Sequence, residues 1–140
     1  MAKRGRKPNP PVLTPDQAGK PTKPATIRQD AHASKLWDFL TKTLAEQEIL
    51  APTDGPILTA LCSAYSRLIR VREVLAKEGL VVKNEKNGAV KAHPLLGVES
   101  GAAGEVHRYA SELGLSPTAR ARVQRIETVA KEETLEDLLA

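Results

Sequence analysis

The stretch from Thr53 to Gly79 constrains the fold more than any other part of the sequence. The Thr53 hydroxyl can cap a helix N-terminus, and Pro56 follows within the first turn, where its missing N–H costs nothing. Gly79 can adopt the left-handed conformation that ends a helix. Between these signals the apolar residues recur at alternating spacings of four and three, which predicts a long helix with a heptad seam. The seam consists of Ile57, Leu61, Ala64, Leu68, Val71 and Leu75.

Leu58, Tyr65 and Ile69 widen this seam, and a face of that width needs more than one partner helix to cover it. The partners can come from the same chain, from other copies of it, or from both. Periodicity alone favours a core helix of a bundle. The other alternative predicts a homo-oligomer, whose oligomerisation residues are Ile57, Leu61, Leu68, Val71 and Leu75.

The positive charge of the chain gathers at its N-terminal end. Residues 1–30 hold seven basic and two acidic residues, a net charge of +5, whereas the remaining residues carry −1 of the overall +4. This segment has six prolines and few large apolar residues, so it cannot bury enough surface to offset its ordering entropy, and we expect a disordered arm. A basic arm suggests an anionic partner, and nucleic acid is the usual one.

The arm begins with Lys3-Arg4-Gly5-Arg6-Lys7-Pro8, which resembles an AT-hook, although Lys7 interrupts the usual Arg-Gly-Arg-Pro core. The Gly lets the backbone approach the floor of the minor groove, and the flanking cations lie in its negative potential. If this arm binds double-stranded DNA, Arg4 and Arg6 enter the groove and Lys3 and Lys7 contact phosphates. The alternative is a solvated charged tail.

Shorter elements flank the long helix. Residues 31–48 predict a first helix with Trp37 as a core anchor, and its short connection to the long helix indicates a helix-turn-helix-like pair. Residues 80–83 and 89–91 flank an Asn-Gly turn, which predicts a small β-hairpin, with an irregular loop as the alternative. Residues 98–113 predict a further helix.

The expected fold class is therefore mainly α: a helical bundle built on a long central helix, with a small β-hairpin or loop excursion. Its parts are a disordered basic arm (1–30), a helical DNA-binding and oligomerisation domain (31–130) and an acidic tail (131–140). Cys62 is the only cysteine, so no internal disulfide is possible. The sequence has no signal core and no membrane-length apolar run, so we expect a soluble, intracellular protein.

A second candidate DNA site lies on the helical body. Lys35 and Lys42 are one heptad apart on the polar side of the first helix, and Arg67 and Arg70 lie on the long helix. Such residues more often solvate a surface or pair with acids. The sequence contains no Gly-rich phosphate loop, no nucleophile–base motif and no metal-ligand spacing, so we predict no enzyme activity, no cofactor and no metal. His93 has no acidic or Cys partner at ligand spacing, so we expect it to be structural.

Residues 131–140 combine four acidic residues and one Lys with Leu135, Leu138 and Leu139. One interpretation of this pattern is a docking peptide, and the other is a frayed terminus.

Several landmarks follow one another in a distinctive order. They are Gly5-Arg6-Lys7-Pro8, Trp37, Asp54 opening the long helix, Tyr65 inside it, Gly79 closing it, His93-Pro94, and Leu113-Gly114-Leu115-Ser116-Pro117 with Arg120. In this order of landmarks the chain resembles the small subunit of the phage terminase. It departs from the family pattern at Gln47-Glu48-Ile49-Leu50, where a Gly is expected before the Leu.

The resemblance implies a role in genome packaging. Small terminase subunits recognise phage DNA, assemble into rings and bring the genome to a large subunit that holds the ATPase and nuclease. The implied partners are double-stranded DNA, further copies of the chain and the large subunit, all in the cytoplasm of an infected bacterial host and with no membrane. Contact with the large subunit would fall to Leu135, Leu138 and Leu139. Two alternatives are a small transcription regulator, which needs a short polar recognition helix, and an adaptor that binds no DNA.

Overall fold

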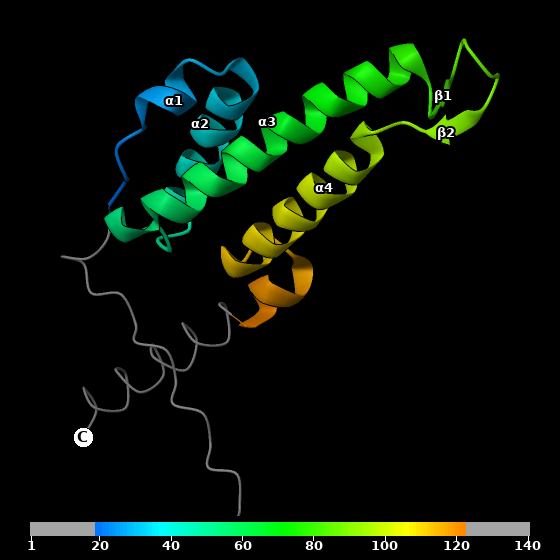
Figure 1. Ribbon diagram of the computed structural model, residues 1–140. Coiled ribbons are helices and arrows are strands. Elements are labelled where there is room, and N and C mark those ends of the chain that lie inside the picture. The colour runs from blue at the N-terminus through cyan, green and yellow to red at the C-terminus, as the bar shows by residue number, and fades with distance from the viewer. Residues whose placement is uncertain (1–18, 123–140) are drawn as a thin grey trace, which may run out of the picture.

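The computed structural model describes residues 19–122, and within them the fold is mainly helical, as predicted. Figure 1 shows α3 running through the middle, with α1 and α2 along one side and α4 antiparallel along the other. A hairpin of β1 and β2 joins α3 to α4 and extends beyond their end. The elements are α1 (Ala25–Arg28), α2 (Ala31–Glu46), a 3-10 turn η2 (Pro52–Asp54), α3 (Gly55–Glu78), β1 (Val81–Lys83), β2 (Val90–Ala92) and α4 (Leu95–Glu112).

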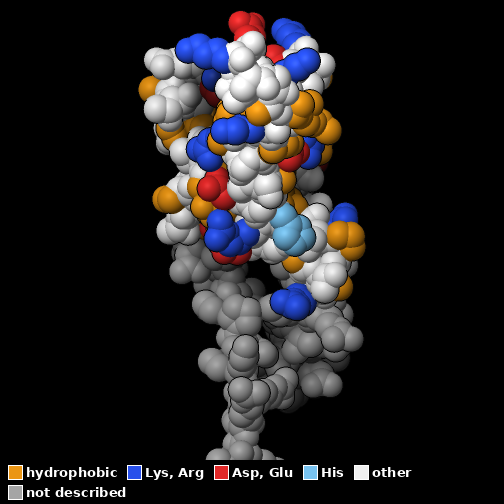
Figure 2. All heavy atoms as spheres, turned by 45° about the vertical axis from the view of Figure 1, so that its right-hand side comes forward, with side chains coloured by type: hydrophobic (Ala, Val, Ile, Leu, Met, Phe, Trp, Pro, Cys, Tyr) orange, Lys and Arg blue, Asp and Glu red, His pale blue; other side chains and the backbone are white. Residues whose placement is uncertain are grey.

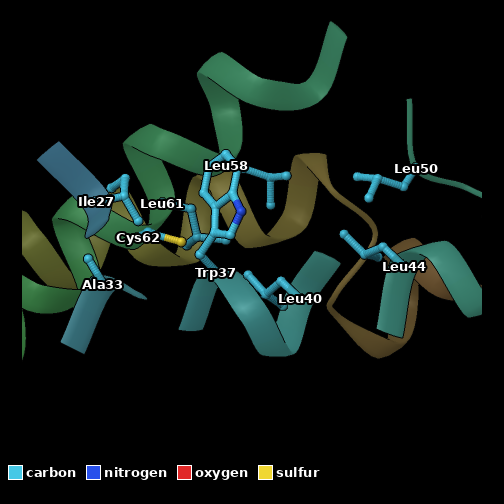
Figure 3. Close-up of a cluster of buried hydrophobic side chains, with 9 residues drawn as sticks. All are labelled: Ile27, Ala33, Trp37, Leu40, Leu44, Leu50, Leu58, Leu61 and Cys62. Carbon is cyan, nitrogen blue, oxygen red and sulfur yellow. The ribbon is translucent and has the colours of Figure 1, made fainter. Parts of the chain in front are cut away.

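The main core lies between α2 and α3. Figure 3 shows Trp37 lying among Leu58, Leu61 and Cys62, and only 2% of the Trp37 surface is exposed. This confirms Trp37 as a core anchor. Val106, Tyr109 and Ala110 of α4, and Leu113 directly after it, pack against the same cluster. The cluster itself consists of Ile27, Ala33, Trp37, Leu40, Leu44, Leu50, Leu58, Leu61 and Cys62.

The chain covers the seam of α3 with its own helices. α3 packs against both α2 and α4, and the exposed fractions of Leu61, Leu68, Val71 and Leu75 are 2%, 6%, 8% and 8%. Ile57 is half-buried. A second copy could reach the four buried side chains only if α2 or α4 moved away, so their part in self-association stays a prediction.

Residues 19–30 differ from the disordered arm that we expected. Ile27 in α1 is 1% exposed, Pro21 is buried, and the amide of Gly19 donates to the carbonyl of Leu50 at 3.1 Å. The buried side chains of Ile27 and Pro21 hold this short stretch against the core. The sequence did not indicate this, because the composition of the arm as a whole is polar. Residues 1–18 lie outside the described part of the chain.

The start of α3 also differs from the prediction. Thr53 lies in the 3-10 turn and does not cap α3, which begins at Gly55. Instead, the Asp54 carboxylate accepts a hydrogen bond from the amide of Ala51 at 2.9 Å and closes the turn. At the other end, Gly79 has a φ of +84° and donates its N–H to the carbonyl of Leu75, so it ends α3 as predicted.

The predicted hairpin is confirmed. β1 and β2 pair antiparallel with Val82 opposite Lys91, and Gly88 takes a φ of +69° in the turn.

His93 fixes the base of this hairpin and the start of α4. Its Nδ1 accepts from the amide of Leu95 at 3.1 Å, so the proton lies on Nε2, which donates to Glu78 at 2.7 Å. α4 consequently begins at Leu95, three residues before the predicted start, because the imidazole takes up an amide that the helix leaves unpaired. His93 therefore has the structural role expected of it.

Glu48 closes α2 in a left-handed conformation. Its φ is +58°, the only positive value among the non-glycine residues of the described chain. The amide of Ile49 then reaches back to the carbonyl of Leu44 at 3.2 Å, in the manner of a helix C-cap. This is the segment in which the family pattern led us to expect a Gly, and the backbone there has the conformation that favours one.

We predict that Glu48→Gly raises the free energy of unfolding by about 0.5–1 kcal/mol, because it relieves a left-handed L-residue. Gln47→Gly is the matched control: Gln47 has a φ of −85°, so its replacement should lower the free energy of unfolding by about 0.5–1 kcal/mol. Urea unfolding of both variants checks the prediction, and equal destabilisation by both would contradict it.

Candidate nucleic-acid interface

Lys35, Phe39 and Lys42 form one outward ridge on α2. Their spacings of four and three place them on one side of the helix, opposite the buried Trp37 and Leu44. Both lysines are exposed, and Phe39 has an exposed fraction of 64%. We call these three residues the α2 ridge.

Phe39 is the residue of this surface that sequence reasoning missed. The helical periodicity of residues 31–48 sets Phe39 beside the apolar face of the helix, and the packing of α2 turns its side chain to solvent. Its neighbours at four residues before and three after, Lys35 and Lys42, were the available signal. Lysines can contact phosphates while an aromatic ring between them lies against sugar or base, so the ridge suits a nucleic acid.

Arg67 and Arg70 are engaged elsewhere. Arg67 Nη1 lies 3.1 Å from Glu105 Oε2 on α4, and Arg70 Nη2 lies 3.1 Å from Asp30 Oδ2. Both arginine side chains are at least half exposed, so each pair contributes little to stability. The structure thus separates the four predicted body residues into two paired arginines and two lysines of the α2 ridge.

Asp30 ties the start of α2 to the middle of α3. Its carboxylate accepts from the amides of His32 and Ala33, both at 3.1 Å, and from the Ser66 hydroxyl at 2.6 and 2.8 Å, and it pairs with Arg70. Partial burial raises the pKa of this carboxyl, but the hydrogen bonds and the guanidinium outweigh it and hold the pKa below its ordinary value of 3.8. The charged carboxylate therefore stabilises the angle at which α2 presents its ridge.

The family described as "Phage terminase, small subunit" matches residues 33–129, which is more than half of the chain. The chain belongs to the phage terminase small subunit family. No curated protein and no solved structure matches it. The family has a role in phage genome packaging and is generally non-enzymatic, since the ATPase and nuclease belong to the large subunit.

The matched part of this small terminase subunit contains the α2 ridge, α3, the hairpin and α4. The other predicted site residues lie outside the described residues, so the structure does not place them. They are Lys3, Arg4, Arg6 and Lys7 in the arm and Leu135, Leu138 and Leu139 in the acidic tail.

The next features concern a reactive thiol, a metal site and a membrane-spanning helix in the described part of the subunit. Burial raises the pKa of the Cys62 thiol to about 12, against a smaller opposing effect of Lys23, so this cysteine stays a neutral core residue. Between residues 19 and 122 no group of three or more His, Cys, Asp or Glu side chains could hold a metal ion. Over the same residues, no helix is long and apolar enough to cross a membrane.

We predict that Asp30→Asn lowers the free energy of unfolding at neutral pH by about 1–3 kcal/mol, because the amide cannot replace the charged acceptor of Ser66 and Arg70. The folded-state pKa of Asp30 is lowered, so its contribution is present above pH 3.8 and is lost as the pH falls through the folded value. The difference between wild type and variant should therefore shrink below pH 3.8. Asp38→Asn, which changes a carboxylate with 68% exposure, is the control and should have little effect at either pH. A pH-independent effect of Asp30→Asn would contradict the prediction.

Proposed function

We propose that this small terminase subunit binds phage DNA, self-associates and delivers the genome to the large subunit. The α2 ridge is the observation that carries DNA binding. Lys35 and Lys42 are exposed on either side of an exposed Phe39, and the ion pairs formed among residues 19–122 involve neither lysine. Cations that are not neutralised by neighbouring acids are the ones able to release counterions from DNA.

The N-terminal arm is the second proposed DNA contact. Lys3, Arg4, Arg6 and Lys7 bring four positive charges within five residues, and Arg4 and Arg6 flank a glycine in the manner of a minor-groove arm. In this proposal the arm supplies electrostatic affinity, whereas the α2 ridge adds an aromatic contact on a rigid helix.

We propose that exposed side chains, and not the buried seam of α3, mediate self-association. Leu61, Leu68, Val71 and Leu75 stabilise the fold of the single chain, and only Ile57 of the predicted set keeps appreciable exposure. The large apolar side chains with the greatest exposure in the described chain are those of Phe39 and of the hairpin. Exposed apolar surface of this kind commonly marks a protein interface.

The acidic tail is proposed to contact the large subunit. Leu135, Leu138 and Leu139 have the spacing of one helix face, surrounded by acidic residues. We predict that replacing the three leucines with Ser weakens large-subunit binding and the stimulation of its ATPase. The control replaces Lys131 and Thr134 with Ser and should leave both unchanged. ATPase stimulation that survives the leucine replacements would remove the tail from this role.

Salt dependence separates the two DNA contacts. Removing residues 1–18 should weaken duplex binding and flatten the slope of log K against log salt by about 3–4, because four phosphate-neutralising cations are lost. The cut is placed before residue 19 because Ile27 and Asp30 belong to the fold. Undiminished affinity and slope would make the arm a solvated tail.

In the full chain, Lys35→Ala with Lys42→Ala should flatten the same slope by about 2. Phe39→Ala should lower the affinity and leave the slope unchanged, because a ring releases no counterions. Lys77→Ala, an exposed lysine in the last turn of α3, is the matched control. Fluorescence anisotropy with labelled duplex at several salt concentrations measures these quantities. If the α2 variants behave like the control, the ridge is not a DNA contact.

A further inference from the structure

The β-hairpin is small, yet four of its large apolar side chains are exposed to solvent. Leu80, Val81, Val82 and Val90 have exposed fractions of 62%, 58%, 45% and 61%. The ribbon extends past the helices in Figure 1, and no third strand pairs with it in the described chain. A two-stranded hairpin without a packing partner is marginally stable in water, and both of its edges leave backbone groups unpaired. These features are typical of a hairpin that packs against a binding partner.

The charges of the hairpin limit what can cover it. Residues 80–92 carry Lys83, Lys86 and Lys91 against Glu85, a net charge of +2. In the strand register Lys83 lies opposite Val90 on one face, which also carries Val81, and Lys91 lies opposite Val82 on the other face. Figure 2 shows basic and apolar side chains together at the upper end of the molecule. A second hairpin would bring like charges together, so the complementary partner is apolar and acidic.

The chain itself contains such a partner. Residues 131–140 carry four acidic residues and one Lys, a net charge of −3, and place Leu135, Leu138 and Leu139 at helical spacing. Its leucines match the exposed Val and Leu side chains of the hairpin, and its carboxylates match the three lysines. Duplex DNA would match the lysines but would leave the four large apolar side chains against a charged backbone. The observations therefore favour the peptide.

The positions of the two segments favour contact between copies. The hairpin lies at one end of the α3–α4 pair, and Arg122, the last described residue, follows the other end. α4 has 18 residues and so spans about 27 Å, a distance along which the tail would have to turn back to meet its own hairpin. Eighteen residues follow Arg122, so residues 131–140 can extend outward from that end toward a neighbour.

Building on the self-association proposed above, we propose that residues 131–140 of one copy dock on the β-hairpin of the next. The leucines pack on Val81 and Val90, and the acidic side chains pair with Lys83 on the same face and with Lys86 in the turn. A contact between two different surfaces joins copies head to tail, which closes into a ring or continues as a filament. Because the same leucines are proposed to meet the large subunit, a tail docked on a neighbour is withheld from the large subunit.

Charge reversal in the full chain tests this contact. One variant reverses the hairpin (Lys83→Glu, Lys86→Glu, Lys91→Glu), and the other reverses the tail (Glu133→Lys, Glu136→Lys, Asp137→Lys). Light scattering and native mass spectrometry at micromolar concentration should show wild-type oligomers and at least tenfold weaker association of either variant alone. Combining both reversals in one chain should restore oligomers of wild-type size, because the basic tail of each copy then meets the acidic hairpin of the next. Lys20→Glu with Arg28→Glu, at two exposed residues outside the hairpin and the α2 ridge, is the matched control and should leave the oligomer size unchanged.

The other possible results overturn either self-association or the contact between tail and hairpin. If the wild type is monomeric, self-association fails and this contact fails with it. If the wild type and both variants form oligomers of the same size, self-association stands through another surface and the tail–hairpin contact is overturned. A chain with both reversals that does not reassemble overturns the contact as well. A hairpin variant that keeps its oligomer size and loses duplex affinity would make the hairpin a DNA contact instead.

Discussion

The two-sided burial of α3 is the interaction on which the rest of this structure depends. Its seam is too wide for one partner, and the chain covers it with α2 on one side and α4 on the other. Both partners are then fixed in position, α2 through the Trp37 cluster and the Asp30 cap, and α4 through His93. The α2 ridge and the hairpin take their places from this arrangement, because each is carried by an element packed on α3.

The same packing decides which cations remain available. α3 and α4 lie close enough for Arg67 to meet Glu105 and for Arg72 to meet Glu99, and Arg70 meets the Asp30 cap. These half-exposed pairs contribute little to stability, yet they neutralise the arginines of α3. The lysines of the α2 ridge and of the hairpin form none of the ion pairs among residues 19–122, so these two surfaces keep their positive charge for DNA or for further copies.

A packaging role also accounts for the exposed apolar residues of the hairpin and for the charged residues at the ends of the chain. A monomeric protein gains nothing from four exposed Val and Leu side chains on a ribbon or from leucines among acids. An assembling subunit can use both. The proposed contact joins two different surfaces of complementary charge, the hairpin and the acidic tail, and a contact of this kind joins copies without a symmetric interface.

The sequence by itself determined the helical class, the extent of α3 to Gly79, the hairpin, the role of Trp37 and the family resemblance. Each of these depends on local periodicity, on a glycine or on a single large side chain. Only the tertiary structure decided that residues 19–30 pack against the rest of the fold through Ile27, that Phe39 faces solvent and that the arginines of α3 are paired. It also showed that α2 and α4 of the same chain cover the apolar seam of α3. These outcomes depend on which segments meet across long stretches of sequence, and periodicity gives the face of a helix but not the partner that covers it.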